Sequence, residues 1–277
     1  MRRGKLFREF PVTGPFRVEI EGETADVSLR AHEGPFVRVE MAYGVHGWGH
    51  GAEERERALL SNPPLRFYGD LLRVGPEPEG VSLDYKLSLP PEAEVEVAVA
   101  TGDVAITGLS KKVRIATGSG DVVLTDIAGE VRVRLGSGDV SLQRVFGALA
   151  IRTGSGDIAG KDIKGDVDGE TGSGDVTLEG VEGELRVRTG SGDVRVAGHG
   201  EEETWRIHTG SGDVDLRLLE HFQAAVELRT DSGDIACTLP IKAEPSEEGV
   251  LRGAVGEAPR ARILVQTESG DITLSRG

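Results

Sequence analysis

The fold is decided by the stretch Asp175–Gly192, which reads DVTLEGVEGELRVRTGSG. With Asp175 counted as position zero, apolar residues stand at positions 1, 3, 6, 10 and 12. The runs around positions 1–3 and 10–12 alternate between apolar and polar residues, which is typical of half-buried strands. Glycines at position 8 and at positions 15 and 17 interrupt these runs, and glycine tolerates the positive φ angles that tight turns need. The stretch therefore predicts two short strands separated by two turns.

The same pattern recurs along most of the chain. TGSGD ends at Asp121, Asp157, Asp175, Asp193 and Asp213, and variants end at Asp103 (TGD), Asp139 (LGSGD), Asp234 (TDSGD) and Asp271 (TESGD). The first five steps between these aspartates are 18 residues each, and the later steps are 20, 21 and 37. We expect the longest step to hold two repeats, one of them degenerate.

A repeat of two strands cannot bury its apolar face alone, so successive copies must stack. Stacking in register places equivalent residues ~4.8 Å apart on parallel strands. The sequence therefore predicts an all-β fold, a parallel β-solenoid (β-helix-like) with two short strands per 18-residue rung. The usual crossover preference favours a right-handed coil.

The front of the chain alternates in the same way but lacks the GSGD turn. We expect residues 1–80 to form irregular N-terminal rungs, with an insertion or cap at about 44–80. This insertion contains the Gly-rich HGWGHG (His46–Gly51) and a candidate helix over Glu53–Leu60. We expect Trp48 to pack over an end or edge of the solenoid.

Residues 81–277 are expected to form the regular array, with irregular last rungs over 239–262. A solenoid exposes an unpaired strand at each end unless something covers it. We expect Ile272–Leu274 to be such an edge strand. Either residues 239–262 fold back over it, which we favour, or a second chain pairs with it.

Composition limits the classes of function. The chain has 277 residues, a net charge of −15, 4% aromatic residues and one cysteine, Cys237. One cysteine excludes an internal disulfide framework, and the acidic balance argues against nucleic acid as the partner. No apolar run approaches the ~18 residues that span a bilayer, and the start shows no signal peptide, so we expect a cytoplasmic protein. A single Asn and few Gln resemble a thermophilic composition.

Two flanking segments and the repeats between them carry a resemblance to a known family. YKLSLPPEAEVEVAVATGDVAI (Tyr85–Ile106) enters the array, TGSGDV rungs follow, and RILVQTESGDITL (Arg262–Leu274) ends it. Together they resemble the bacterial "putative adhesin" β-solenoid domains, a family of unknown function. The resemblance covers residues from about 80 to 277 well and the front loosely. It implies a parallel β-solenoid with an adhesin-like or envelope-stress-related role, and it supplies no catalytic residue.

The repeat also predicts a column of carboxylates along one edge of the solenoid. Its members are Asp103, Asp121, Asp139, Asp157, Asp175, Asp193, Asp213, Asp234 and Asp271. Calcium needs roughly 6–8 oxygen ligands, and one Asp per rung supplies too few. We therefore expect structural carboxylates that accept hydrogen bonds from turn N–H groups or from hydroxyls, and no metal site. A calcium-stabilised repeat protein stays as an alternative.

The outward face of the second strand of each rung carries a basic stripe. Its members are Arg114, Arg132, Arg134, Arg152, Arg186, Arg188 and Arg206. Such a stripe could bind an anionic polymer or a lipid head group. The alternative, which we favour, is a solvated face with ion-pair ladders, in which Glu170 lies between Arg152 and Arg188.

Other chemistry is weakly represented. His46 and His50 flank Trp48, but no third metal ligand is visible nearby. No nucleophile, zinc or phosphate-binding motif is present. The best enzyme candidate is a crowd of carboxylates, because glycoside cleavage needs two of them in different environments. The crowd consists of Asp157, Asp162, Asp166, Asp168 and Asp175.

We therefore expect a non-catalytic β-solenoid scaffold or binding module without a cofactor. Its partner would be an unknown protein, a polysaccharide or an envelope component, and the chain would be a monomer or a dimer. The alternatives are a carbohydrate-active β-helix enzyme and the calcium-stabilised repeat protein.

Overall fold

The computed structural model describes residues 1–219 and 222–277. Strands make up 64% of the chain and helix 4%, and most strands are parallel, so the expected all-β solenoid is confirmed. The chain divides into two compact units, Met1–Gly136 and Ser137–Gly277. The expected boundary near residue 80 and the handedness of the coil stay predictions. None of the helices in the described residues is long and apolar enough to cross a membrane.

The first unit contains one helix, α1 (His50–Ser61). Its strands are β1 (Arg2–Pro11), β2 (Arg17–Thr24), β3 (Val27–Ala31), β4 (Phe36–Val45), β5 (Leu65–Phe67), β6 (Leu71–Val74), β7 (Val81–Leu89), β8 (Glu94–Thr101), β9 (Val104–Thr107), β10 (Val113–Ser119), β11 (Val122–Ile127) and β12 (Val131–Ser137), whose last residue opens the second unit.

The second unit consists of strands in its described residues. They are β13 (Val140–Phe146), β14 (Leu149–Ser155), β15 (Ile158–Lys164), β16 (Val167–Ser173), β17 (Val176–Glu182), β18 (Leu185–Ser191), β19 (Val194–His199), β20 (Thr204–Ser211), β21 (Val214–Leu218), β22 (Ala224–Ser232), β23 (Ile235–Cys237), β24 (Ile241–Ala243), β25 (Val250–Val255), β26 (Ala261–Ser269) and β27 (Ile272–Arg276).

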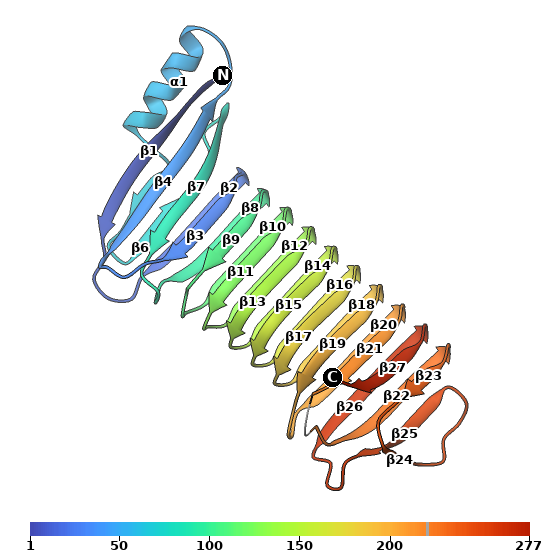
Figure 1. Ribbon diagram of the computed structural model, residues 1–277. Coiled ribbons are helices and arrows are strands. Elements are labelled where there is room, and N and C mark those ends of the chain that lie inside the picture. The colour runs from blue at the N-terminus through green and yellow to red at the C-terminus, as the bar shows by residue number, and fades with distance from the viewer. Residues whose placement is uncertain (220–221) are drawn as a thin grey trace. The chain divides into compact units, whose positions relative to one another are not determined.

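Each rung gives one strand to each of two sheets. Sheet A holds the strands that follow the Asp turn, such as β15, β17 and β19, and sheet B holds those that lead into the GSG turn, such as β16, β18 and β20 (Figure 1). Equivalent positions pair in register, for example Val176 with Val194 and Thr171 with Thr189. The alternating apolar residues point between the sheets and are almost fully buried. The core is therefore a stack of Val, Ile and Leu, into which Trp205 adds the largest buried side chain.

In the first unit the rungs do not stack in chain order. β2 pairs in parallel with both β6 and β8, and β3 pairs in parallel with both β7 and β9. The rung formed by β2 and β3 therefore lies between two rungs that follow it in the sequence. Chain connectivity alone does not predict this, because the looser front rungs carry no GSGD turn to mark their order.

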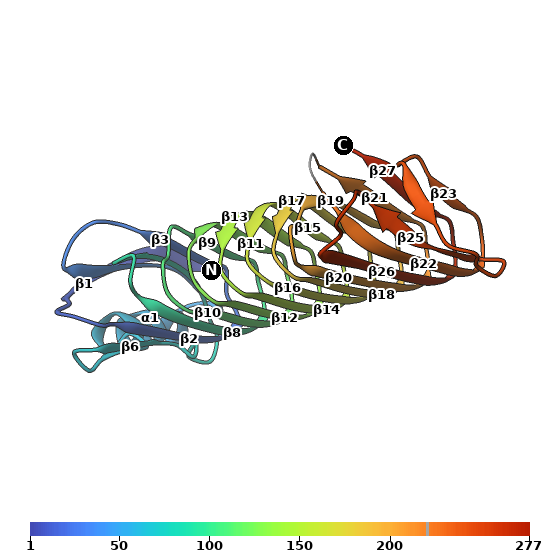
Figure 2. The same ribbon diagram turned by 90° about the horizontal axis from the view of Figure 1, so that it is seen from below.

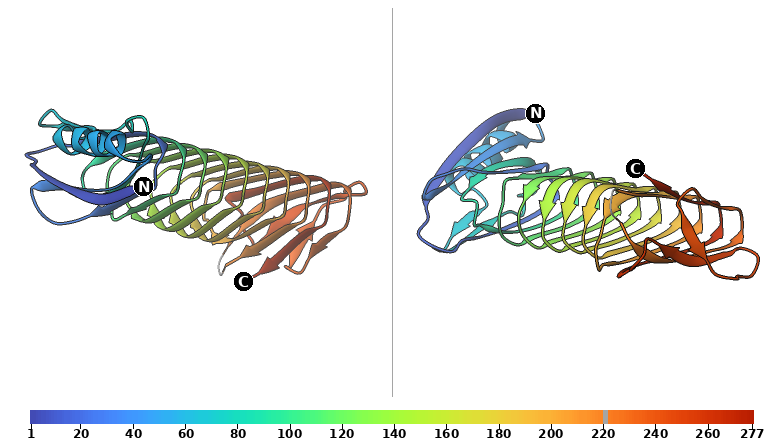
Figure 3. Two further views of the ribbon diagram at one scale, coloured as in Figure 1. Left: turned by 90° about the horizontal axis from the view of Figure 1, so that it is seen from above. Right: turned by 60° about the horizontal axis from the view of Figure 1, so that its bottom comes forward.

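The outer end of the first unit is closed by antiparallel strands and by α1. β4 pairs antiparallel with β7, and β1 pairs antiparallel with β4. The expected helix over Glu53–Leu60 is present and begins at His50; it lies alongside β1 and β4 (Figure 3). Phe67 stacks on Phe10 with ring centroids 4.9 Å apart and lies 6.3 Å from Phe16. These rings pack at the outer end of the core, beside the outermost rung, which β6 and β7 form.

In the second unit the final rung is inserted between earlier ones. β26 pairs in parallel with β20 and β22, and β27 pairs in parallel with β21 and β23 (Figure 2). The expectation that Ile272–Leu274 is an edge strand is wrong, because β27 has a neighbour on both sides. The 37-residue step holds no stacked degenerate rung. Instead, β25 pairs antiparallel with β22 and with β24, and thereby covers the edge of β22.

Candidate functional site

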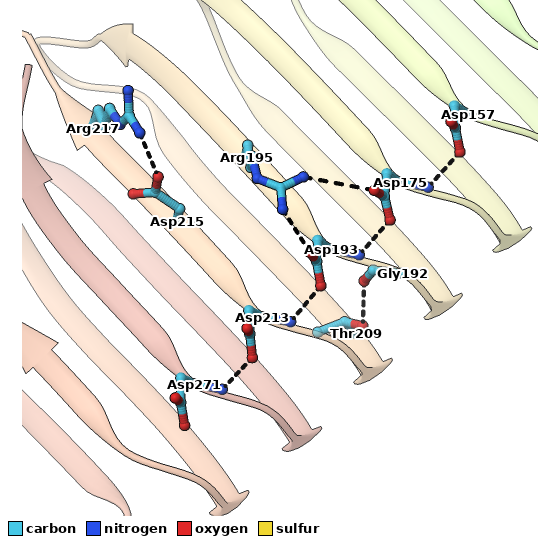
Figure 4. A network of polar contacts seen from close by, with 10 residues as sticks. All are labelled: Asp157, Asp175, Gly192, Asp193, Arg195, Thr209, Asp213, Asp215, Arg217 and Asp271. Atoms are coloured by element: carbon cyan, nitrogen blue, oxygen red, sulfur yellow. Dashed lines mark hydrogen bonds and ion pairs between the residues drawn. The ribbon is translucent and has the colours of Figure 1, made fainter.

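The aspartate column lies along the turn that precedes sheet A. Along the column, Oδ1 of one Asp accepts the backbone N–H of the Asp in the next rung, at 2.8 Å for Asp157 to Asp175 and for Asp175 to Asp193 (Figure 4). The column begins earlier than the repeats indicate, since the N–H of Asp103 donates to Oδ1 of Asp26 at 3.0 Å. The signal for Asp26 was the ADV at Ala25–Val27, which matches the GDV of later rungs.

Threonine completes this edge from the other strand. The buried hydroxyl of Thr171 donates to the carbonyl of Gly156 at 3.0 Å, and that of Thr189 donates to Gly174 at 3.2 Å. Thr209 repeats the contact with Gly192 at 3.3 Å (Figure 4). The hydroxyls thus satisfy turn carbonyls while the carboxylates satisfy turn N–H groups. Such pairing matters because a buried polar group without a partner costs about 1–3 kcal/mol.

This geometry uses the carboxylates for hydrogen bonding within the turns. Among the described residues, no group of three or more His, Cys, Asp or Glu side chains is arranged to hold a metal ion. The second oxygen of Asp193 is held by Arg195 Nη2 at 2.6 Å, and Arg195 also lies 3.6 Å from Asp175 (Figure 4). The column is therefore a row of carboxylates that accept hydrogen bonds from turn N–H groups. Near Asp175 and Asp193, Arg195 is ion-paired with it.

The five carboxylates of the enzyme hypothesis are not brought together. Asp157 and Asp175 belong to the column, and Asp162 lies on β15 in sheet A. Asp166 lies in the opposite turn, where its Oδ1 accepts the N–H of Glu184 at 3.2 Å. Asp168 points outward from β16 in sheet B. The five carboxylates are thus divided among the Asp column, the opposite turn and the two sheets.

The HGWGHG segment also differs from expectation. The side chain of Trp48 is 93% exposed, so the expectation that it packs over the solenoid is wrong. His50 begins α1 and lies 3.6 Å from Glu53. The carbonyl of His46 accepts a hydrogen bond from Arg55 at 2.9 Å, which ties the segment to the helix. Glycines at 47 and 49, with φ angles of 114° and 65°, turn the chain here and leave the indole in solvent.

In the first unit the arginine stripe is largely compensated. Arg114 lies opposite Glu96 in the register of β8 and β10. Arg132 lies 3.4 Å from Glu130, which also pairs with Lys112 at 2.9 Å. The hydrogen bond from Lys112 lowers the pKa of Glu130 below its usual range, and nearby arginines act in the same direction. Arg134 lines a shallow hollow with Leu135 and small residues of β8 and β10.

In the second unit the stripe begins with a compensated pair. Glu170 lies between Arg152 and Arg188 in the register, as the sequence predicts, and its carboxylate lies 3.4 Å from Arg152. Similar pairs occur on sheet A, where Glu182 binds Lys164 at 3.0 Å and His199 at 3.2 Å. The hydrogen bond from Lys164 is the main reason that the pKa of Glu182 is lowered.

Beyond Glu170 the outward face of sheet B becomes basic. Arg186 lies beside Arg206 and Arg188 beside His208, on β18 and β20. The inserted β26 places the uncharged Leu264 and Gln266 next to them, and β22 follows with Glu227 and Arg229. These side chains surround a hollow of about 470 Å³, which we call the arginine hollow. It is lined by Arg186, Arg188, Arg206, His208, Glu227, Arg229, Leu264 and Gln266.

The central arginines of this hollow are not held by side-chain contacts. In residues 1–219 and 222–277, the side chains of Arg186, Arg188 and Arg206 form no hydrogen bond or ion pair, although Asp168 and Glu170 are the register neighbours of Arg186 and Arg188. At the far side, Glu227 is held by Arg252 at 2.9 Å and Arg229 by Asp231 at 3.3 Å. Like charges side by side on neighbouring strands destabilise a sheet. These arginines therefore form a local basic patch on a chain of net charge −15.

The sequence predicted only part of this surface. Arg186, Arg188 and Arg206 belong to the predicted stripe, whereas His208, Arg229 and Gln266 were missed. Arg229 and Gln266 each precede the Thr of a TxSGD turn, at the same place in the repeat as Arg188. That position was a usable signal, but the out-of-order stacking of β26 concealed which strands are neighbours.

Comparison with known proteins agrees with the architecture. The model of the family described as Toastrack DUF4097 matches residues 92–160 and 166–275, which together make up more than half of the chain. The comparison with curated proteins gave no match.

Solved structures offer remote likenesses. One is a putative cell adhesion protein from Clostridium sporogenes ATCC 15579, with 8% identity, a TM-score of 0.24 and complete coverage of both chains. Another is a putative adhesin from Parabacteroides merdae ATCC 43184, with 8% identity and a TM-score of 0.27, covering 99% of this chain and 96% of that one. A third, from Parabacteroides distasonis ATCC 8503, has 9% identity and a TM-score of 0.27, covering 99% and 97%. At these TM-scores the likenesses support no conclusion about fold or ligand.

The family match rests instead on the repeats themselves, and it confirms the resemblance that the TGSGDV rungs carry. This chain belongs to the Toastrack DUF4097 family.

Proposed function

We propose that this chain is a non-catalytic binding module whose arginine hollow holds an extended anionic polymer, such as a carboxylated or sulfated polysaccharide. The observation that carries the proposal is the row of unpaired arginines on adjacent strands of sheet B, Arg186, Arg188 and Arg206. A guanidinium group binds carboxylate or sulfate-like oxygens through two parallel hydrogen bonds. Arg186, Arg188 and Arg206 offer three such groups, whose side chains form no ion pair in the part of the chain that the structure describes.

The arrangement fits a polymer better than a single small anion. The cations lie on β18, β20 and β22, the uncharged Leu264 and Gln266 of β26 lie between β20 and β22, and neighbouring strands are ~4.8 Å apart. A chain lying across the strands along the row of Arg188 would meet Arg188, His208, Gln266 and then Arg229 in succession. Arg186, Arg206 and Leu264 form the neighbouring row, which ends at Glu227, and Leu264 would contact uncharged parts of the polymer.

Nucleic acid and membranes fit less well. Phosphate-backbone binding depends on an extended basic surface. Asp168 and Glu170 border the hollow on β16 and limit the basic area to a few strands. A lipid surface would meet these carboxylates and the arginines together, whereas a single polymer chain can follow the arginines alone.

The test is a binding titration with polygalacturonate and dextran sulfate, with uncharged dextran as the reference. We expect binding of at least one charged polymer, weakened at least tenfold by Arg186→Ala combined with Arg206→Ala, and weakened by salt. Arg217→Ala is the matched control, because Arg217 is an exposed arginine of sheet A that pairs with Asp215 at 2.9 Å. Binding to anionic vesicles but to neither polymer, or equal loss in the Arg217 variant, would overturn the proposal.

A further inference from the structure

β1 presents a long open edge on the first unit. It pairs with β4 over ten residues, and no strand of the described chain pairs with its other side. The other strands that end the sheets, β5, β23 and β24, have three residues each. Short edge strands give a foreign strand little to pair with, whereas a long one offers a full set of hydrogen-bonding groups. The edge of β1 is thus the one sheet edge in the described residues that is long enough to pair with a full added strand.

The hydrogen-bonding pattern identifies which groups face outward. Val12 donates its N–H to the carbonyl of Pro35 at 2.9 Å, in line with the register of β1 and β4. Hydrogen-bonded pairs alternate along an antiparallel ladder, so the even-numbered residues of β1 bond to β4. The N–H and C=O groups of Arg3, Lys5, Phe7 and Glu9 therefore point to the open side. The carbonyl of Phe7 accepts a hydrogen bond from the Arg8 side chain at 2.9 Å, which agrees with this assignment.

The charge of β1 is opposite to that of the whole chain. Its sequence, RRGKLFREFP, contains four cations and one acid. Arg2 pairs with Glu53 and Glu56 of α1, and Lys5 pairs with Glu40 at 2.5 Å. Neither Arg3 nor Arg8 contacts a carboxylate within the described residues.

The two uncompensated cations lie on opposite faces of the strand. Arg8 shares the inner face with Leu6 and Phe10, while Arg3 and Lys5 share the outer face. Arg3 and Lys5 also line a hollow of about 570 Å³, beside the small Ala42 and Gly44 of β4. An added strand with acidic side chains would therefore find a cation on each face.

We infer that the open side of β1 accepts an extended acidic segment of a partner protein as an added strand. Main-chain hydrogen bonds to Arg3, Lys5, Phe7 and Glu9 would supply affinity, and contacts of alternate side chains with Arg3 and Arg8 would supply specificity. A second copy of β1 fits less well, because it would bring four further cations to the same edge. This inference concerns the first unit and does not depend on the arginine hollow.

The test uses a capped ten-residue peptide with Glu at alternate positions and Thr or Val between them. We expect the intact protein to bind it and to gain amide-exchange protection at Phe7. Two changes should each weaken binding at least tenfold: N-methylation of alternate backbone amides of the peptide, and the double substitution Arg3→Glu with Arg8→Glu. Arg186→Ala, in the arginine hollow, is the matched control and should leave peptide binding unchanged.

Each alternative outcome is decisive. Equal binding of the N-methylated peptide shows simple charge attraction and overturns strand addition. A dimer in light scattering, with β1 amides protected without peptide, shows that a second copy occupies the edge and also overturns it. Thermal unfolding of each variant identifies any change in folding. If the double variant unfolds at a lower temperature, the N-methylated peptide with the unchanged protein still decides the question.

Discussion

Oδ1 of Asp213 accepts the backbone N–H of Asp271 at 2.8 Å, although 58 residues separate the two in the sequence. Oδ1 of Asp271 in turn accepts the N–H of Asp234 at 2.8 Å. The column of turn acceptors therefore continues from Asp213 through Asp271 to Asp234, against the order of the chain. This contact follows the order in which the last rungs stack, and that order determines which side chains meet in the arginine hollow.

The stacking order can be tested with paired cysteines. Leu264 is the register partner of Arg206 on one side and of Glu227 on the other. In a Cys237→Ser background, we expect Arg206→Cys with Leu264→Cys to form a disulfide on mild oxidation, since neighbouring strands satisfy the ~4.4–6.8 Å Cα separation required. Arg206→Cys with Glu227→Cys should not, because β26 lies between them. Mass spectrometry of peptide fragments reads out both pairs, and the reverse result would mean that the rungs stack in chain order.

The aspartate column makes a prediction about hydrogen bonding as opposed to charge. Asp157 accepts the N–H of Asp175 at 2.8 Å. Asp157→Ala leaves that N–H to solvent and should lower the free energy of unfolding by ~1 kcal/mol. Asp157→Asn keeps an acceptor oxygen and should cost less than half as much. Urea denaturation compares the two, and equal losses would show that the carboxylate acts through its charge.

The second glycine of the GSG turns should tolerate no side chain. Gly192 has a φ angle of 148°, and a methyl group there would collide with the carbonyl oxygen of Gly174 in the preceding rung. Gly192→Ala should therefore lower the free energy of unfolding by more than ~2 kcal/mol. Gly51, in α1, has open space around its Cα position. Gly51→Ala should leave stability unchanged or raise it by up to ~1 kcal/mol, and a similar loss for both variants would contradict this account.

The ion pair on sheet A predicts a dependence on pH. The hydrogen bond from Lys164 is the main cause that lowers the pKa of Glu182 below its ordinary value of 4.5, and His199 adds to it. A lowered folded-state pKa contributes stability above the unfolded value, which is lost as the pH falls through the folded value. Lys164→Met should thus reduce stability at pH 7 by ~0.5 kcal/mol, given that the pair is exposed.

The loss caused by Lys164→Met should shrink as the pH falls from about 4.5 toward the lowered pKa of Glu182. Urea denaturation between pH 3 and pH 7 measures it, with Glu182→Gln as the companion variant. A loss that stays constant below pH 4 would indicate that Lys164 stabilises the strand through packing of its methylene chain.

The regular rungs could be predicted from the sequence because each strand of a rung repeats the same local rule. Val176 and Val187 alternate with polar neighbours, and the GSG before Asp193 marks the turn, so neither strand requires knowledge of its partners. The ends could not be predicted in this way. The motifs of Asp234 and Asp271 are nearly identical, and either rung could stack on Asp213 as far as local pattern is concerned.

The candidate sites were likewise predicted where the repeat pattern marks a residue and missed where strand pairing decides. Arg186 and Arg188 were found because their position within the repeat places them on the outer face. The opening of the hollow was not found, because it depends on Leu264 and Gln266 being brought beside β20 by the inserted strand. The open edge of β1 depends on the antiparallel pairing with β4, and no repeat marks it.

The rungs that stack out of chain order also limit the order in which strands can pair during synthesis. β22 and β23 leave the ribosome before β26 and β27, yet their final neighbours are these later strands and not β20 and β21. The emerging chain must either hold β22 and β23 away from the growing stack or release them from a first, sequential docking. A circularly permuted gene can place β26 and β27 before β22 and β23 in the chain. If this exchange of neighbours limits refolding, the original chain should show a slow refolding step that the permuted chain lacks.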